Sequence, residues 1–463
     1  MSMMSLAEAA RLLQGELRGI DAQIAAVSTD SRNLRPGGLF VALVGPRFDG
    51  HDFVAAAWRQ GACAALVSRP VAAALPQIQV ADTRLALGRL GAAWRARFGG
   101  WVIALTGSNG KTTVKEMLAA ILSCRGRVLA TQGNLNNDIG VPLTLLRLTA
   151  DYAYAVIEMG ANHAGEIAYL TQLARPDVAL VNNAGPAHLE GFGDLNGVAR
   201  AKGEIYQGLG PRGIAVINGD DPYADYWTGL VSGREVYDFG LDQPARVAGR
   251  ALDADCNRFR LQAAEQYVDI QLPLLGRHNL RNALAAAATG LAVGIDLEAI
   301  RQGLETMAGV AGRLQPLSGL NGCQLINDTY NANPASLAAA LAALAGVAGP
   351  KWLVLGDMAE LGPGTAALHK QAGHQVRAAG FQRLYGLGSY SRYAVEAFGS
   401  GGRHFETVET LIAALREAVV QERPTVLIKG SRSMRMERVI QALLRETPAV
   451  IQQGADSHAG AAG

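Results

Sequence analysis

A glycine-rich loop between an apolar run and a helical pattern constrains this chain more than any other feature. Residues 106–113 read Thr-Gly-Ser-Asn-Gly-Lys-Thr-Thr, after the apolar run 102–105 and before the helical pattern 114–122. In this context backbone N–H groups and the helix start can surround a phosphate, Lys111 adds a positive charge, and the Thr112 hydroxyl can ligate Mg²⁺. The loop departs from the general pattern, whose first glycine would fall at Leu105, and an ordinary glycine turn is the alternative. We predict that ATP is bound by Gly107, Ser108, Asn109, Gly110, Lys111, Thr112 and Thr113.

The sequence around this loop predicts an α/β fold. Apolar runs at 102–105, 154–157, 178–181 and 214–217 each stop at polar or glycine residues, and helix-length segments separate several of them. Strands that are apolar on both faces are typical of a parallel sheet covered by helices on both sides. We therefore expect a doubly wound, mostly parallel sheet, with antiparallel strands added near 247–272 and a helix over 279–291.

Three domains fit the length of 463 residues, because a domain usually has roughly 100–200 residues. Short β-like runs at 39–44 and 64–67 precede a boundary at Gly99–Gly100, and a strand–helix rhythm resumes at 351–355, 383–387 and 425–428. We predict a small α/β domain at 1–99, the central phosphate-loop domain at 100–312, and a Rossmann-like domain at 313–447. The Ala-, Gly- and Gln-rich tail, 448–463, is expected to be disordered.

Composition and charge exclude several classes of protein. The formal net charge of +2 predicts no nucleic-acid surface, and the four cysteines form no C-x-x-C pair. The first residues indicate an amphipathic helix rather than a secretory signal, and the longest weakly polar stretch, 283–295, is short of the about 18 residues that a membrane span needs. We expect a cytoplasmic monomer without membrane insertion.

Two side chains that follow the predicted strands are candidates for metal binding. Glu158 directly follows the run 154–157, and His188 lies beyond the run 178–181, so both should reach the carboxyl edge of the parallel sheet. The alternatives are an ordinary loop carboxylate and a structural or solvated histidine. Lys202, taken alone, is most simply a solvated lysine on a helix.

Several motifs occur together in one order along the chain. The loop at 106–113, Glu158, His188 and Lys202 are followed by Gly-Arg-His-Asn-Leu-Arg-Asn at 276–282 and Asp-Thr-Tyr-Asn-Ala-Asn-Pro at 328–334. Over about residues 25–440 the chain resembles the Mur ligases. The resemblance implies an ATP- and Mg²⁺-dependent enzyme that phosphorylates a carboxylate and then joins it to an amine, through an acyl phosphate.

The last motif indicates which substrates the resemblance implies. The run Tyr-Asn-Ala-Asn-Pro at 330–334 is similar to that of the family member that adds D-alanyl-D-alanine to UDP-N-acetylmuramoyl-tripeptide in peptidoglycan synthesis. Sister ligases carry an Ala-His-Thr-Pro-like run with a downstream Asp-Asn-Pro-Arg, and folylpolyglutamate synthases carry Gly-Ala-His-Asn-Pro. Neither pattern is found here, although a sister ligase and a nucleotide-dependent switch remain the competing interpretations.

The resemblance also implies roles for individual residues. Lys111, Lys202, His188 and Arg313 would be catalytic, and the metal ligands would be Thr112, Glu158, His188 and Lys202 as its carbamate. Further ATP contacts would come from Asn279, Asn282, Arg313, Asp328 and Tyr330. Ser28, Thr29, Asp30, Ser31 and Arg32 would bind uridine, and Asn134 and Asn136 the sugar and diphosphate. Asn331, Asn333 and Ser431 would bind the dipeptide.

Simpler explanations exist for the polar residues among these. Helix capping would explain Asn279 and Asn282, an Asx-turn is the alternative at Asn333, and a plain loop would explain Asn134 and Asn136. His369 and His374 are expected on the solvated face of a helix, without a role in the site.

Overall fold

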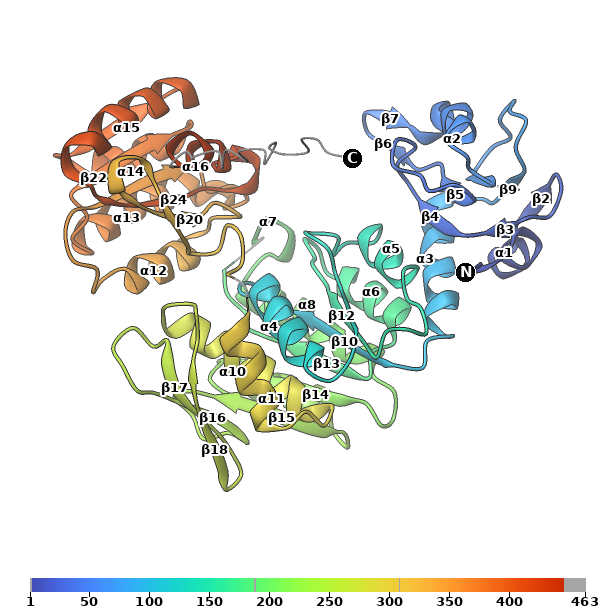
Figure 1. Cartoon of the computed structure of the whole chain (residues 1–463), viewed down its shortest axis with the longest axis horizontal. Coiled ribbons are helices and arrows are strands. Elements are labelled where there is room, and N and C mark those ends of the chain that lie inside the picture. The colour runs from blue at the N-terminus through green and yellow to red at the C-terminus, as the bar shows by residue number, and fades with distance from the viewer. Residues whose placement is uncertain (1, 187–188, 308, 445–463) are drawn as a thin grey trace, which may run out of the picture. The chain divides into compact units, whose positions relative to one another are not determined.

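The computed structural model of the chain describes residues 2–186, 189–307 and 309–444 (Figure 1). Contacts divide the chain into two compact units. The first comprises Met1–Val310, Asn333–Gly346 and Glu360–Thr365, and the second comprises Ala311–Ala332, Val347–Ala359 and Ala366–Gly463. The predicted disorder of 448–463 concerns residues outside the described part of the chain.

The N-terminal part of the first unit is a small α/β domain, as predicted. Its five-stranded sheet has the order β2 (Glu16–Arg18), β9 (Gln77–Gln79), β8 (Ala64–Val67), β5 (Gly38–Val41) and β4 (Ala26–Ser28). Its helices are α1 (Leu6–Leu13), α2 (Val54–Arg59) and α3 (Thr83–Arg95), and two short pairs join β1 (Met4–Ser5) to β3 (Gln23–Ile24) and β6 (Val44–Gly45) to β7 (Phe48–Asp49). Helix α1 buries Leu6, Ala9, Ala10 and Leu13, which share one helical face, so the amphipathic helix expected near the N-terminus is confirmed.

The central sheet carries the glycine-rich loop. Its nine strands have the order β11 (Val128–Ala130), β12 (Tyr154–Glu158), β10 (Trp101–Thr106), β13 (Val178–Val181), β14 (Ile214–Asn218), β15 (Glu235–Gly240), β16 (Val247–Ala251), β17 (Arg258–Ala263) and β18 (Gln266–Gln271). The pairs from β11 to β16 are parallel, and β16, β17 and β18 pair antiparallel. The predicted parallel sheet with appended antiparallel strands is therefore confirmed.

Helices cover both faces of this sheet (Figure 1). Alternate side chains of β10 take part in two separate apolar cores, since Ile103 and Leu105 join one and Val102 and Ala104 the other. The first core includes α4 (Lys111–Ser123), α10 (Arg277–Ala292) and α11 (Leu297–Thr306), and the second includes α5 (Gly140–Leu145), α6 (Glu166–Ala174), α8 (Leu195–Gly203) and α9 (Ala224–Leu230). Burial on both faces explains why the strands were recognisable as continuous apolar runs.

The second unit contains a six-stranded sheet of the Rossmann-like kind. The strand order is β19 (Gln315–Ser318), β20 (Gln324–Asp328), β24 (Thr425–Lys429), β21 (Lys351–Gly356), β22 (Arg383–Leu387) and β23 (Gly402–Phe405), and β19 alone of these runs antiparallel to its neighbour. The later helices of the chain are α13 (Thr365–Ala378), α14 (Ser391–Phe398), α15 (Val408–Glu422) and α16 (Glu437–Leu443). Helices α15 and α16 complete the apolar core on one face of this sheet. Across the described residues, no helix is both long and apolar enough to cross a membrane.

Candidate functional site

The glycine-rich loop connects β10 to α4 at the carboxyl edge of the central sheet. Gly110 precedes the first residue of α4 with φ at +80°, a conformation that favours glycine. A Cβ atom at Gly110 would lie 2.4 Å from Asn282 Oδ1 and 2.7 Å from Asn182 Nδ2. Both the backbone conformation and the close packing therefore require glycine here.

Two asparagines that follow β13 hold the loop in place. The N–H groups of Ser108 and Asn109 donate to the Asn183 backbone and side-chain oxygens at 3.0 and 2.9 Å. Asn182 Nδ2 donates to the Asn109 carbonyl and to Asn282 Oδ1, each at 3.0 Å. Among the residues that directly follow β13, the sequence predicted a role only for His188.

The start of α4 supplies the phosphate-binding chemistry that the loop was predicted to have. The N–H groups in the first turn of a helix have no intrahelical acceptor, and they lie at the positive end of the helix dipole. Lys111 Nζ donates to the Gly107 carbonyl at 2.7 Å, so its ammonium lies over the loop. Thr112 and Thr113 are buried at the base of the same turn. This arrangement suits a bound phosphate chain.

Glu158 is a buried carboxylate at the end of β12, in register with Leu105 of β10. Its Oε1 atom accepts a hydrogen bond from Asn136 Nδ2 at 2.8 Å, and its N–H donates to Thr131 Oγ1 at 3.0 Å. Its Oε2 atom is buried and has no hydrogen-bond partner among the described residues. Leaving such an oxygen without a donor is costly, and a hard cation would satisfy it.

A magnesium ion fits this position. Thr112 lies in the first turn of α4, which follows β10, and Glu158 ends the adjacent parallel strand β12. Hydroxyl and carboxylate oxygens are ligands that Mg²⁺ prefers. No group of three or more His, Cys, Asp or Glu side chains that could hold a metal occurs in the part of the chain that the structure describes. An ion here would take its remaining ligands from phosphate oxygens and water, as Mg²⁺ commonly does.

Lys202 is buried on α8, with 2% of its surface exposed, so it is not the solvated lysine that its sequence context alone suggested. Burial is the main cause that lowers its pKa to about 7, and the positive charge of Lys111 adds to this effect. The carboxylates of Glu166 and Glu204 partly oppose the shift. A large fraction of Lys202 is therefore an unprotonated amine near neutral pH. His188, the other candidate ligand, lies outside the described residues.

Asn279 and Asn282 lie in the first two turns of α10, and both are buried. Asn282 accepts from Asn182 and donates to Asn279 Oδ1 at 3.3 Å, while Asn279 donates to the Leu275 carbonyl at 2.9 Å. Asn282 thus braces the glycine-rich loop from the side of α10. Their predicted contact with ATP stays a prediction.

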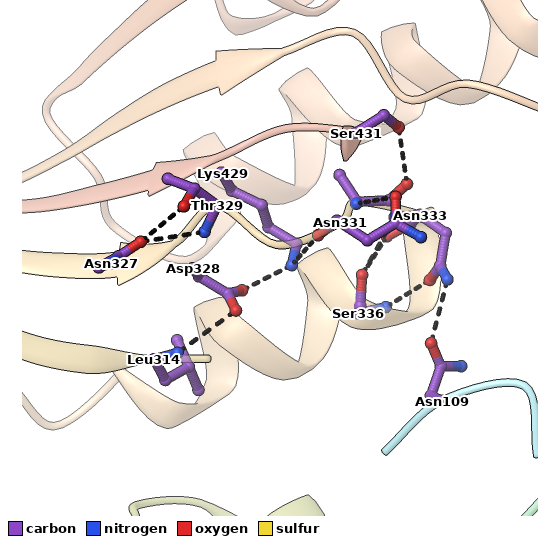
Figure 2. Close-up of polar contacts among 11 residues, drawn as sticks. Asn109, Leu314, Asn327, Asp328, Thr329, Asn331, Asn333, Ser336, Lys429 and Ser431 are labelled. Carbon is purple, nitrogen blue, oxygen red and sulfur yellow. Dashed lines mark hydrogen bonds and ion pairs between the residues drawn. The ribbon is translucent and has the colours of Figure 1, made fainter. Parts of the chain in front are cut away.

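In the second unit, the predicted residue Asp328 forms a buried ion pair with Lys429 (Figure 2). Lys429 Nζ contacts Asp328 Oδ2 at 2.6 Å and donates to the Asn331 carbonyl at 3.0 Å. Burial lowers the pKa of Lys429, and the Asp328 carboxylate offsets part of that effect. The Arg313 guanidinium lies 4.1 Å from the centre of the Tyr330 ring, and its buried Nε has no partner among the described residues. Arg313 therefore keeps a donor that an anionic ligand would satisfy.

The residues predicted to bind the dipeptide make local hydrogen bonds. Ser431 Oγ accepts from the Ala359 N–H at 2.8 Å and donates to the Ala332 carbonyl at 3.3 Å. Asn331 Oδ1 accepts from the Ala332 N–H at 2.9 Å. Asn333 caps helix α12 (Pro334–Ala343) in a reciprocal capping box with Ser336, as Figure 2 shows.

Asn333 also reaches the glycine-rich loop within the first unit, because its Nδ2 atom donates to Asn109 Oδ1 at 3.0 Å. The Asn333 side chain accepts from the N–H three residues on, as a helix cap does, whereas the Asx-turn that was the alternative joins residues two positions apart. The contact of Asn331, Asn333 and Ser431 with a dipeptide stays a prediction.

The predicted uridine-binding residues form a polar turn after β4. Ser28 Oγ accepts from the Asp30 N–H at 3.0 Å, and Arg32 forms an ion pair with Asp30 at 2.9 Å. Thr29 and Ser31 complete this turn, and both are partly exposed. The turn has polar groups that a nucleoside could contact, and its role in uridine binding stays a prediction.

The expectation for His369 is wrong, while that for His374 is confirmed. His374 is exposed, whereas His369 is fully buried on α13 and its Nε2 atom accepts from the Met358 N–H at 2.9 Å. The His369 ring also stacks on Tyr390, with ring centres 5.8 Å apart. His369 thus stabilises the loop after β21 instead of facing water.

Comparison with known proteins decides the family. Residues 23–95, 105–290 and 312–432 match, in turn, the families described as "Mur ligase family, catalytic domain", "Mur ligase middle domain" and "Mur ligase, glutamate ligase domain". The chain is 49% identical over 443 residues to UDP-N-acetylmuramoyl-tripeptide--D-alanyl-D-alanine ligase of Escherichia coli, covering 95% of this chain and 98% of the relative. The chain belongs to the Mur ligase family.

Solved structures agree with this assignment. This Mur ligase resembles MurF from Acinetobacter baumannii with a TM-score of 0.89 at 37% identity, covering 95% of this chain and 99% of that one. It also resembles MurF from Thermotoga maritima, solved in complex with ADP, with a TM-score of 0.79 at 29% identity, covering 90% of this chain and 96% of that one. The predicted membership of an ATP-dependent ligase family is confirmed.

Proposed function

We propose that this Mur ligase joins D-alanyl-D-alanine to UDP-N-acetylmuramoyl-tripeptide, with conversion of ATP to ADP and phosphate. The observation that carries the proposal is the identity of 49% to the E. coli ligase of that name, over nearly the whole length of both chains. The run Tyr-Asn-Ala-Asn-Pro at 330–334 supports the same substrates. The product would be the UDP-linked pentapeptide of peptidoglycan synthesis.

The chemical problem is that a carboxylate oxygen is a poor leaving group and the γ-phosphate repels a second anion. Phosphorylation of the tripeptide carboxylate solves the first difficulty, because the amine of the dipeptide can then displace phosphate from the acyl carbon. The first turn of α4 and Lys111 would reduce the repulsion by placing N–H groups and a positive charge beside the phosphates. Mg²⁺, held by Thr112 and by the free oxygen of Glu158, would neutralise further phosphate charge.

Lys202 would act as a carbamate. Its unprotonated amine can form an N–C bond to CO₂ and release a proton, which converts a cation into a carboxylate-like anion. The pKa of about 7 favours this reaction near neutral pH, because only the neutral amine is nucleophilic. With His188, the carbamate would hold a second cation, which would offset the repulsion between the phosphate and the acceptor carboxylate.

Residues 313–333 and Ser431 would supply the remaining contacts. Arg313 has a buried donor that could pair with the γ-phosphate, its guanidinium lies over the Tyr330 ring, and Asp328 accepts from the N–H of the next residue, Leu314. Asn331, Asn333 and Ser431 would orient the dipeptide as it attacks the acyl phosphate. ATP would bind first, then the UDP-tripeptide, then the dipeptide, in a cytoplasmic monomer.

A substrate-dependence assay tests this function. The protein is incubated with ATP, Mg²⁺, D-alanyl-D-alanine and the UDP-muramoyl tripeptide carrying either diaminopimelate or lysine, and ADP and the ligated product are measured. We expect both to appear only when the tripeptide and the dipeptide are present together. ADP release without the tripeptide would favour a nucleotide switch, and ligation of a single amino acid in place of the dipeptide would favour a sister ligase.

A further inference from the structure

The segment 131–136 crosses the carboxyl end of β12 and holds Glu158 and its neighbours. The Thr131 N–H donates to the Val156 carbonyl at 3.0 Å, and Thr131 Oγ1 accepts from the Glu158 N–H at 3.0 Å. The Gly160 N–H donates to the Asn136 carbonyl at 2.8 Å. The backbone on both sides of Glu158 is therefore fixed to this one segment.

The Asn136 side chain is held in a single orientation. A Cβ atom at Gly160 would lie 2.9 Å from Asn136 Oδ1 and 3.0 Å from its Cγ, so the amide packs directly on the Gly160 backbone. The Asn136 N–H also donates to the Asn134 carbonyl at 2.7 Å, which closes a tight turn. With the amide fixed in this way, Nδ2 donates to Glu158 Oε1 at 2.8 Å.

A buried lysine anchors the start of the same segment to α4. Lys115 is 1% exposed, one helical turn after Lys111, and its Nζ atom donates to the Thr131 carbonyl at 2.8 Å. Glu116 Oε1 lies 2.9 Å from the same ammonium. The helix that begins at the phosphate loop is thus connected through Thr131 to the backbone of Glu158.

We propose that Asn136 is a positioning residue for the metal-binding carboxylate, and that Lys115 and Thr131 support it. By donating to Oε1, Asn136 fixes the rotation of the carboxylate and leaves the other oxygen, Oε2, for the cation. Replacing a residue that orients a metal ligand typically lowers the metal affinity about 10–100-fold. This role is distinct from the predicted contact of Asn136 with the substrate's sugar or diphosphate, and it rests on the proposed role of Glu158 as a Mg²⁺ ligand.

Direct measurement of metal binding tests the inference separately from catalysis. Asn136→Leu removes the hydrogen bond while keeping a side chain branched at the same carbon, and Gln132→Ala is a control because Gln132 is an exposed amide of the same segment. Binding of Mn²⁺ is followed by electron paramagnetic resonance in the presence of saturating ADP. We expect Asn136→Leu to raise the Kd for Mn²⁺ by about 10–100-fold, as for other residues that orient metal ligands. Gln132→Ala should leave the Kd within twofold of wild type.

Two further measurements separate the inference from its premise. The affinity for ADP in EDTA should be unchanged in Asn136→Leu, and a fall as large as that for Mn²⁺ would show general damage to the loop and overturn the positioning role. Glu158→Gln serves as the reference variant and should lose Mn²⁺ binding. If Glu158→Gln loses Mn²⁺ binding while Asn136→Leu binds Mn²⁺ like wild type, the positioning role of Asn136 is refuted and the role of Glu158 as a ligand stands. If Glu158→Gln also binds normally, the metal assignment of the proposed function fails with it.

Discussion

Replacement of the buried Lys202 by methionine should stabilise the protein while removing its activity. Methionine occupies a similar volume, and the Lys202 side chain already lies against an apolar neighbour, with Nζ 5.3 Å from the centre of the Phe192 ring. Burial disfavours the protonated amine, which the unfolded chain retains at neutral pH. The native state therefore loses stability by holding this lysine.

The magnitude follows from the fall of the Lys202 pKa from its ordinary value of 10.5 to about 7. At 1.36 kcal/mol per pKa unit, the difference reaches about 5 kcal/mol well below pH 7, about 4 kcal/mol at pH 7 and about 2 kcal/mol at pH 9. Between pH 7 and 10.5 the unfolded chain binds more protons at this site than the folded chain does. The contribution of Lys202 to stability accordingly rises with pH, and the advantage of Lys202→Met should shrink across that range.

Urea denaturation in buffer depleted of CO₂ measures this effect. The transition is followed by tryptophan fluorescence, since Trp227 is buried and donates to the Ala199 carbonyl of α8. Lys370→Met, at an exposed lysine, is the control and should change stability by less than about 0.5 kcal/mol. A Lys202→Met variant less stable than wild type, or an advantage that does not change between pH 7 and pH 9, would refute the reasoning.

Three further outcomes follow from the site and the ion pair. Gly110→Ala should weaken ADP binding at least about tenfold, as measured by calorimetry, because an alanine in the left-handed conformation costs about 1–2 kcal/mol and its Cβ would collide with Asn282. Normal affinity would contradict the packing described. Lys429→Met should lower the free energy of unfolding of the second unit by about 3–5 kcal/mol in urea denaturation, because it leaves the Asp328 carboxylate buried without its partner. The double variant Lys429→Met, Asp328→Leu should regain most of that stability, and equal losses in the single and double variants would argue against a buried charge as the cause. Lys202→Ala should lose ligase activity and regain part of it with added short carboxylates, which assays with and without formate or acetate would measure; no gain would count against the carbamate.

The sequence predicted the sheets well because their strands are buried on both faces. The run 102–105 corresponds to Trp101–Thr106, and the run 154–157 to Tyr154–Glu158, since continuous apolar residues leave little choice of structure. Glu158 was recognisable as a candidate ligand because its place directly after a strand fixes the sheet edge that it reaches. The fold and the position of this candidate ligand thus depend on local sequence.

Other features depend on contacts between distant segments, which no local pattern encodes. The burial of Lys202 results from packing of α8 within the domain. His369 is buried against the loop after β21, where its ring accepts a hydrogen bond from the Met358 N–H. Asn136 was predicted to contact substrate because a small polar loop suits a sugar. Its hydrogen bond to Glu158 joins residues 22 positions apart in the chain and became visible only in three dimensions.

The three asparagines around the phosphate loop have a consequence for how conditions affect the enzyme. Asn182, Asn183 and Asn282 hold the loop through neutral amides, which neither gain nor lose protons in the physiological range and are little affected by salt. Lys202 is different, because burial lowers its pKa to about 7 and its charge therefore changes near neutral pH. Changes in pH or ionic strength should therefore alter the electrostatic attraction between the site and its ligands without altering the conformation of the loop. A change in ligand affinity with pH or salt would then report the charges of the site.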